Sequence, residues 1–365
     1  MRIEVIDTGE GIEQSKLNDI WERYYKVDKN HKRAAVGTGL GLNIVKTILD
    51  MHQGATSVSY THLDVYKRQI ISIFEEGFIY GIMAIGVYIT YKVLDFPDLT
   101  VDGSFPLGMC LTGLLISVGV DPWIACVLSF LAGAVAGGIT GILHVKFKVT
   151  NLLSGILVMT ALWSINLVIT NGSAVLSFFN KPTIFNSGIG SLFTGVMSDY
   201  KVLIMTGVLV ILVKIIIDLY LKTKSGLLLR ASGSNPQFVT SLGRDSGKMK
   251  VLGLAIGNGL TALSGSILGQ QSGSANINSG TGMVVMALAS VIIGTTLFKK
   301  VTIMKATTAV ILGSILYKAC LSIAMLIGLP TNYLKLLMAG ILAVVLISNN
   351  MLTGRRKKVH DNTKK

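Results

Sequence analysis

The arrangement of apolar residues changes abruptly near residue 70 of this 365-residue chain. Before that point, short alternating and helix-like patterns are mixed with charges, which is typical of a soluble domain. After it, apolar runs recur at about the length that crosses roughly 30 Å of hydrocarbon. The expected spans are about 70–91, 104–120, 122–143, 151–171, 200–221, 251–270, 281–298, 306–328 and 333–350. The pattern predicts an all-α polytopic membrane protein with eight to ten transmembrane helices and, in front of it, a partial α/β segment.

Composition supports this division. The chain is 51% hydrophobic and only 14% charged, as membrane proteins are. Its formal net charge is +14, and the excess of Lys and Arg over Asp and Glu belongs almost entirely to the membrane part. These bases lie between and after apolar runs, where the positive-inside rule places cytoplasmic loops. We therefore expect a lipid bilayer, and not nucleic acid, as the partner of the basic residues.

The basic loops also predict orientation. The stretches 144–148, 222–250 and 299–305 and the basic tail 351–365 should be cytoplasmic. The stretches 171–200 and 272–280 carry two charged side chains between them and should face outward. Lys92 shares its connection with three acidic residues, so the first two spans are not oriented by charge. The three cysteines lie within apolar runs without metal-ligand spacing, so we expect buried small hydrophobes and no metal site: Cys110, Cys126 and Cys320.

Two polar, glycine-bearing stretches, 95–104 and 272–282, each open an apolar helix. Their correspondence suggests an internal repeat whose exposed helix N-termini face a polar substrate. Carboxylates near a bilayer are costly unless they face water or protein, which favours a substrate path, and an ordinary surface loop stays open as the alternative. The residues assigned to the path are Asp95, Asp98, Thr100, Asp102, Ser104, Asn276 and Asn278.

The stretch 223–245 is too polar to span a membrane. It predicts two short helices with a break between Gly233 and Pro236. A basic and apolar surface element of this kind suits the groove of a partner protein. A plain connecting loop is the alternative.

The first part contains a short strand that runs into a glycine-bearing turn, and later a glycine-rich loop that opens a helix. Such loops offer backbone N–H groups to phosphate. Residues 1–54 resemble the ATP-binding domain of sensor histidine kinases, although the helix with the metal-binding asparagine and the phosphoacceptor histidine are missing. The fragment has lost about half of its strands, so we expect neither stable folding nor ATP turnover. The resemblance assigns vestigial ATP-binding roles to Asp7, Gly9, Gly11, Gly37, Gly39 and Gly41.

Residues 55–69 form a linker without helical or strand periodicity. The twelve residues 58–69 resemble a translated adaptor peptide, and the resemblance implies that the join is an assembly artefact. A natural solvated linker is the alternative.

Residues 70–350 resemble the permease subunit of ATP-binding-cassette importers of the branched-chain amino acid type, in the tryptophan/tyrosine or uncharacterised-solute subgroup. The resemblance is carried by residues 94–108, 226–231, 275–278 and 291–294. It implies a non-catalytic subunit of the bacterial cytoplasmic (inner) membrane that binds no cofactor. ATP would be used by a separate ATPase, with an extracytoplasmic solute-binding protein and a second permease copy as further partners. The residues that resemble the ATPase-coupling region are Gly226, Arg230, Ala231, Gly233, Asn235 and Gly243.

Two other functions stay open. A sensor histidine kinase fusion with ATP-binding activity would explain the first part, although its spans would follow the kinase core. An ion-coupled secondary transporter would explain the repeat and the polar stretches, but not the coupling-like loop. Relatives often carry an acidic residue where Asn276 and Thr295 stand here, so the resemblance does not name the solute.

Overall fold

The computed structural model describes residues 62–188, 190, 200–301, 304–326, 333, 336–344 and 346, together with 19–21, 42 and 45–47 of the first part. The chain divides into two compact units, Met1–Gln69 and Ile70–Lys365. Within the first unit, a 3-10 turn, η2, covers Asp19–Trp21. The predicted ATP-binding residues of the first part and the tail 351–365 lie outside the described residues.

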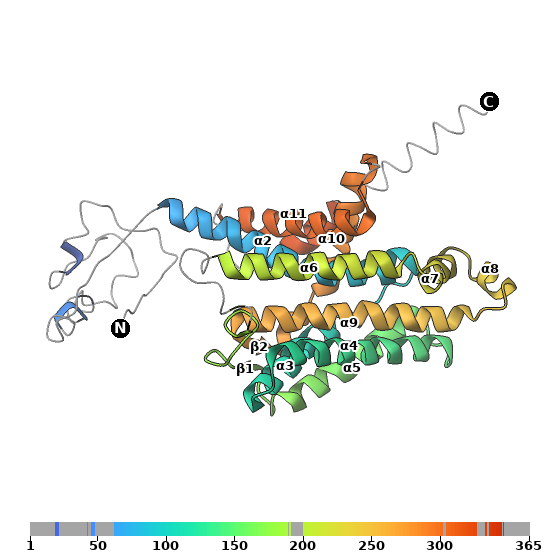
Figure 1. Cartoon of the computed structure of the whole chain (residues 1–365), viewed down its shortest axis with the longest axis horizontal. Coiled ribbons are helices and arrows are strands. Elements are labelled where there is room, and N and C mark those ends of the chain that lie inside the picture. Colours follow the sequence, from blue (N-terminus) through green and yellow to red (C-terminus); the bar gives the residue numbers. More distant parts are fainter. Residues whose placement is uncertain are drawn as a thin grey trace. The chain divides into compact units, whose positions relative to one another are not determined.

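The second unit is a bundle of helices (Figure 1). Within the described residues, eight helices are long and apolar enough to cross a membrane, which confirms the predicted all-α polytopic class. These are α2 (His62–Val87, continued by the π-helix η3, Tyr88–Val93), α3 (Val101–Val118), α4 (Pro122–Val145), α5 (Asn151–Ile169), α6 (Lys201–Tyr220), α9 (Ser246–Ser272), α10 (Met283–Leu297) and α11 (Ala306–Leu326). Residues 336–344 and 346, inside the ninth expected span, are also helical.

Short elements join these helices. The helices α7 (Lys224–Ser234) and α8 (Pro236–Ser241) lie between α6 and α9, with the break at the predicted place. Strands β1 (Val175–Ser177) and β2 (Ser274–Asn276) pair antiparallel and so join the two stretches that were expected to face outward. Two further 3-10 turns flank α10: η6 (Ile277–Gly280) and η7 (Phe298–Lys300).

The start of α2 differs from the expectation. The linker was expected to lack helical structure, yet the helix begins at His62 and continues without a break into the first span. Nucleation is the costly step of helix formation, whereas propagation adds one hydrogen bond for each residue fixed. A stable apolar span can therefore extend a helix into residues that have no helical periodicity of their own.

Local sequence signals fix the ends of several helices. Asp121 accepts a hydrogen bond from the Trp123 N–H at 2.8 Å, and Pro122 occupies the first position of α4. Asp245 caps α9 by accepting from the Gly247 and Lys248 N–H groups. Such caps satisfy N–H groups that have no partner within the helix. The helix α9 stops at Gly273, whose left-handed conformation suits glycine.

The helix α9 lies at the centre of the bundle and packs most extensively against α4 and α3 (Figure 1). The helices approach closely because glycine, which has no Cβ atom, occupies the points of contact. A Cβ atom at Gly137 on α4 would overlap the Leu254 carbonyl oxygen, and one at Gly108 on α3 would overlap that of Ala262. Small residues at such crossings allow helix backbones to approach closely inside a membrane.

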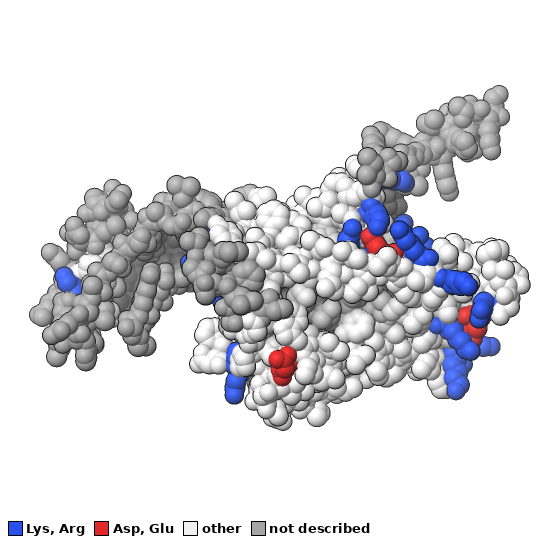
Figure 2. All heavy atoms as spheres, in the orientation of Figure 1, with Lys and Arg blue, Asp and Glu red and all other residues white. Residues whose placement is uncertain are grey.

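The packing of α2 orients the first span. About halfway along α2, Glu75 accepts a hydrogen bond from Gln271 at the end of α9, and further along α2 the Ile79 carbonyl oxygen accepts one from Ser264. The two helices are therefore antiparallel. Lys and Arg side chains gather at the end of the bundle that holds α7 and α8 (Figure 2), the end that the positive-inside rule makes cytoplasmic. With that orientation, α2 enters the membrane from the outward side.

Two helices begin near the middle of the bundle. Ser104, in the first turn of α3, hydrogen-bonds to Asn258 halfway along α9. The N-terminus of α10 meets the first turn of α3, because Asp102 accepts hydrogen bonds from the Gly282 and Val284 N–H groups. The two polar interruptions that suggested a repeat therefore meet inside the protein.

The outer surfaces of α4, α5 and α6 are apolar. In α5 only 28% of the membrane-spanning segment is buried, and the same holds for α6. These helices therefore present most of their apolar residues to the surroundings. Such a surface suits lipid or another membrane protein. The exposed apolar side chains include Ile124, Leu131, Val135, Ile139, Leu157, Ile165, Val208, Ile211 and Ile215. Cys110 and Cys126 are buried as expected, but Cys320 is exposed on α11, so its assignment as a buried hydrophobe is wrong.

Candidate translocation and coupling sites

A buried polar network surrounds the start of α3. The Asn258 amide donates to Asp98 Oδ2 at 2.6 Å, and its carbonyl oxygen accepts from Ser104 at 2.8 Å. The Thr100 N–H donates to Asp98 Oδ1 at 2.9 Å, and the Thr100 and Thr140 hydroxyls lie 2.8 Å apart. A buried carboxylate is tolerated when its oxygens accept hydrogen bonds. These path candidates thus tie α3 to α4 and α9.

Asp102 serves a different contact. Its carboxylate oxygens accept from the Gly282 N–H at 3.1 Å and the Val284 N–H at 2.8 Å. A carboxylate at a helix N-terminus satisfies free N–H groups and complements the helix dipole. The sequence suggested that this N-terminus would face a substrate. The structure corrects that expectation, because Asp102 occupies the position in front of α10.

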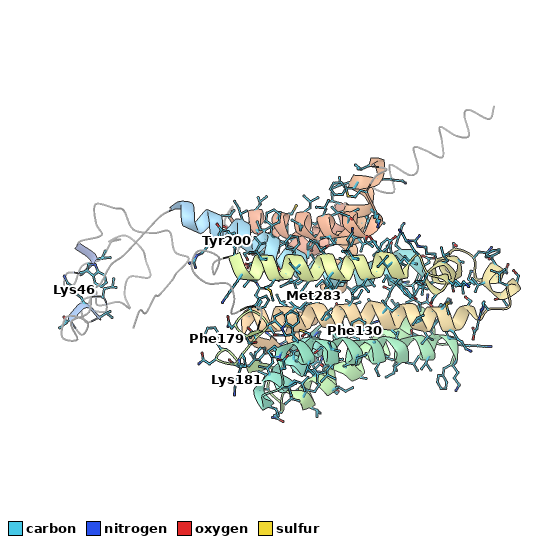
Figure 3. All side chains as sticks on the ribbon, viewed as in Figure 1. Lys46, Phe130, Phe179, Lys181, Tyr200 and Met283 are labelled. Atoms are coloured by element: carbon cyan, nitrogen blue, oxygen red, sulfur yellow. The ribbon has the colours of Figure 1, made fainter. Side chains whose placement is uncertain are left out.

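Two further path candidates, Asn276 and Asn278, lie close together in and after β2. Asn276 ends β2, and its side chain accepts from the backbone N–H of the exposed residue Asn278. Phe179 and Lys181, which follow β1, lie at the same end, opposite α7 and α8 (Figure 3). Asn276 therefore belongs to the outward side, together with the paired strands.

A cavity of about 480 Å³ opens beside Asn276. Helices α2, α3 and α9 and the β2 segment contribute its walls. The volume falls within the range of about 300–1,000 Å³ that is usual for small-molecule sites. Its lining residues are Glu76, Tyr80, Met109, Leu268, Gln271, Ser272, Ser274 and Asn276.

Only one of the residues that line this outward cavity, Asn276, was predicted from the sequence. Glu76 lies inside the first span and forms an ion pair with Lys318, which lies inside the span of α11. A carboxylate and an ammonium group in two apolar runs mark a functional site on their own, because unpaired charges are costly there. The two charged residues could therefore be found in the sequence. Their pairing became evident only from the structure, which places α2 beside α11.

A second cavity, of about 790 Å³, lies at the cytoplasmic end. Asp95, predicted to line the path, lines it together with Arg230 and Gly233, predicted to couple to the ATPase. Asp95 has a φ of 55°, a left-handed conformation that is uncommon for a residue other than glycine. The other lining residues are Tyr88, Tyr91, Lys92, Val93, Ser234 and Ala306.

The coupling candidates form one compact element. Gly226 packs on the end of α6, where a Cβ atom would overlap the Tyr220 carbonyl oxygen, and Gly233 packs on the Val93 carbonyl oxygen of η3 in the same way. Asn235 ends α7 and caps α8 by accepting from the Phe238 N–H at 3.1 Å. Arg230 and Gly243 are exposed, and Ala231 is half-buried. Movement of α7 would therefore reach η3 by direct backbone contact.

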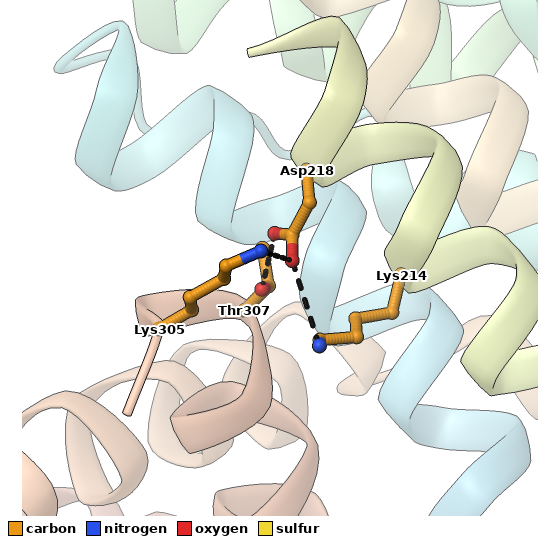
Figure 4. A network of polar contacts seen from close by, with 4 residues as sticks. All are labelled: Lys214, Asp218, Lys305 and Thr307. Carbon is orange, nitrogen blue, oxygen red and sulfur yellow. Dashed lines mark hydrogen bonds and ion pairs between the residues drawn. The ribbon is translucent and has the colours of Figure 1, made fainter. Parts of the chain in front are cut away.

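A cluster of polar side chains joins α6 to the start of α11 nearby (Figure 4). Asp218 accepts hydrogen bonds from Thr307 at 2.6 Å and from Lys305 at 3.0 Å, and Lys214 lies 3.5 Å from the same carboxylate. Hydrogen bonds to a charged group are stronger than those between neutral groups. This cluster fixes α11 beside the cytoplasmic cavity, whose lining includes Ala306.

Residues 69–346 match the family described as branched-chain amino acid transport system / permease component. The chain belongs to this family. A tyrosine transport system permease protein of Clostridioides difficile is 43% identical over 288 residues, which cover 79% of this chain and 94% of the relative. An uncharacterized protein of Rickettsia prowazekii, RP368, is 31% identical over 76% of this chain and 97% of the relative. A ribose import permease protein of Haemophilus influenzae is 24% identical over 62% of this chain and 68% of the relative.

Residues 1–75 match a second family, described as histidine kinase-, DNA gyrase B-, and HSP90-like ATPase. The sensor histidine kinase YclK of Bacillus subtilis is 46% identical over 57 residues, only 15% of this chain and 12% of the relative. No solved structure matches the chain. The two parts thus match unrelated families, as the predicted chimera requires.

The permease family identifies the second unit as a transport subunit of an ATP-binding-cassette importer, with ATP hydrolysis on a separate subunit. Importers of this class work with an ATPase and a solute-binding protein. The eight apolar helices and the family make it a multi-pass protein of the bacterial inner membrane. Among the described residues, no group of three or more His, Cys, Asp or Glu side chains is placed to hold a metal ion.

Proposed function

We propose that this permease forms the translocation pathway for an amino acid or a similar small solute. The observation that carries the proposal is the outward cavity, which combines an ionised side chain, neutral polar groups and apolar side chains. A solute with a charged end and an apolar body matches that combination. The relative named as a tyrosine transport permease supports L-tyrosine as the first candidate.

We further propose that α7 and α8 dock into the ATPase subunit. Arg230, Asn235 and Gly243 lie on the exposed side of this element and would meet the partner. Gly233 would transmit movement to η3 and the cytoplasmic cavity, where Asp95 lies. In this proposal the permease binds no cofactor, the ATPase uses ATP, and a second copy of the permease completes the pathway.

The path candidates then divide into two proposed roles. Asp98 and Ser104 hold the start of α3 against α9, Thr100 holds it against α4, and Asp102 holds the start of α10 against α3. Asn276 and Asn278 form the outward rim of the path. The two halves would change their relative position around these fixed contacts during alternating access.

The test is uptake of labelled L-tyrosine by cells that express the full chain together with an ATPase and a solute-binding protein of this importer class. We expect uptake that requires the ATPase. A Gly233→Val variant should lower uptake at least tenfold, because its side chain would collide with the Val93 carbonyl oxygen. ATP hydrolysis and co-purification with the ATPase should change much less.

Gly138→Val on α4 is the matched control, because it makes the same substitution where a Cβ atom would meet nothing within 4 Å. It should transport normally. Uptake that is driven by an ion gradient without the ATPase would reject the proposed function in favour of a secondary transporter. Uptake by Gly233→Val at the wild-type rate would reject the coupling route.

A further inference from the structure

Two carboxyl groups and one amino group lie at or beside the outward cavity. Glu75 and Glu76 lie on α2, and Lys318 lies on α11, all within spanning helices. Glu76 lines the cavity and pairs with Lys318, whereas Glu75 bonds to the lining residue Gln271. Ionised groups at such depth are costly unless a pathway uses them.

The pair between Lys318 and Glu76 is accessible but partly shielded. Lys318 Nζ donates to Glu76 Oε2, and the Ser72 hydroxyl donates to the other carboxylate oxygen at 3.4 Å. The exposed fractions of the side chains are 15% for Lys318 and 24% for Glu76, and Glu76 lines the cavity. The Lys318 ammonium also lies 6.0 Å from the centroid of the Tyr80 ring. A ligand in the cavity can therefore reach Glu76, the member of the pair that lines it.

Gln271 adds a hydrogen-bond acceptor without a partner. Its amide nitrogen donates to Glu75 Oε2 at 3.2 Å. The other amide atom, Gln271 Oε1, is buried and has no hydrogen-bond partner among the described residues. Such an atom is costly to leave unpaired, and a ligand that donates hydrogen bonds would satisfy it.

The rest of the cavity surface is suited to the body of a small ligand. Tyr80, Met109 and Leu268 form an apolar wall, and Ser272 and Ser274 lie on the side of β2. The acceptor groups, Glu76 and Gln271, belong to different helices that meet at this cavity. The cavity therefore combines acceptor groups with apolar surface.

We propose that this cavity recognises amino acids as zwitterions by exchange of the ion pair between Glu76 and Lys318. The substrate ammonium group donates to Glu76 and to Gln271 Oε1. Lys318, released from Glu76, pairs with the substrate carboxylate, and the substrate side chain lies against Tyr80 and Met109. A solute without ionised groups, such as a sugar, has no charges that could replace the pair. The inference rests on the proposed transport of amino acids and specifies the substrate class.

Equilibrium binding to the purified full chain in lipid nanodiscs tests the site without the ATPase or the binding protein. The probe is radiolabelled L-tyrosine, with three competitors: tyramine, which lacks the carboxylate, 3-(4-hydroxyphenyl)propionate, which lacks the ammonium group, and ribose. We expect saturable binding of tyrosine. Both single-charge analogues should compete roughly tenfold more weakly, in line with the loss of one charged hydrogen bond, and ribose should not compete.

Variants separate recognition from support of the fold. Glu76→Gln and Lys318→Gln should each weaken tyrosine binding roughly tenfold or more. The exchanged double variant, Glu76→Lys with Lys318→Glu, retains an ion pair and should be obtained at the wild-type yield, yet it should not bind tyrosine. Asp121→Asn is the matched control, because it makes the same carboxylate-to-amide change at an exposed helix cap, a position that asparagine also suits, and Asp121 does not line the outward cavity. It should bind tyrosine as the wild type does.

The outcomes distinguish this inference from the proposed function. Absence of saturable binding, unchanged binding by Glu76→Gln, equal competition by the acid without an ammonium group, or full binding by the exchanged variant would each overturn the zwitterion site. ATPase-dependent uptake that Glu76→Gln leaves unchanged would reject the site and retain the transport function. If the chain binds tyrosine with the expected discrimination but supports no ATPase-dependent uptake, the transport function is rejected and the site is retained.

Discussion

At the scale of single residues, Asn258 connects groups that lie far apart in the chain. Its amide donates to Asp98 and its carbonyl oxygen accepts from Ser104, so one side chain satisfies two polar groups of the other half. All three residues are buried. The loss of a partner in such a place leaves a polar or charged group without hydrogen bonds, which costs more than the bond itself contributes.

We therefore expect Asn258→Ala to lower stability by about 2–4 kcal/mol, because Asp98 and Ser104 both lose a partner. Ser104→Ala removes a single neutral hydrogen bond and should cost about 0.5–1.5 kcal/mol. Thermal unfolding of both variants in the same detergent measures the difference. Equal losses would show that the bond to Asp98 contributes nothing beyond the bond to Ser104.

At the scale of elements, the contact between α4 and α9 depends on which face each glycine occupies. Gly137 faces α9, where a Cβ atom would overlap the Leu254 carbonyl oxygen. Gly138 is its direct neighbour in the sequence, and a Cβ atom there would meet nothing within 4 Å. Adjacent glycines in one helix thus have opposite roles, since successive residues point in different directions.

Alanine at each position tests this arrangement with one added methyl group. Gly137→Ala should lower the unfolding temperature in detergent by several degrees, because α4 must move away from α9. Gly138→Ala should leave it unchanged or raise it slightly, because alanine favours the helix by up to about 1 kcal/mol over glycine. A comparable loss in both variants would argue against the close contact.

The length and spacing of apolar runs were sufficient to predict the spans, and turn residues were sufficient to predict the break between α7 and α8. These are local properties of the sequence. The contacts of Asp98 and Asp102 could not be predicted, because their partners Asn258 and Val284 lie more than 150 residues away. The helical continuation to His62 was also missed, because it depends on the stability of the span that follows and not on the linker itself.

At the scale of the whole molecule, the order and direction of the helices determine which loops share a side. The paired strands β1 and β2 lie at the end opposite α7 and α8, and the basic side chains favour α7 and α8 as the cytoplasmic end. The transport function belongs to the part that matches the permease family, residues 69–346. The first part matches only a small fraction of each sensor kinase that it resembles.

Cysteine labelling in intact cells tests this orientation. Lys181→Cys and Lys224→Cys place one thiol at each end, in a chain whose exposed Cys320 is replaced by Ser. Lys181→Cys should react with a membrane-impermeant maleimide in intact cells. Lys224→Cys should react only after the cells are permeabilised. The reverse pattern would contradict the orientation deduced from the basic loops.

The hydrogen bond between Asp98 and Asn258 can form only late in the synthesis of the chain. Its two residues are separated by 160 positions. At about 5–20 residues per second, a ribosome adds Asn258 roughly 8–32 s after Asp98. During that interval the first helices have already left the ribosome, while Asp98 still lacks its partner from α9. The buried carboxyl of Asp98 therefore waits for this hydrogen bond until most of the permease has been synthesised.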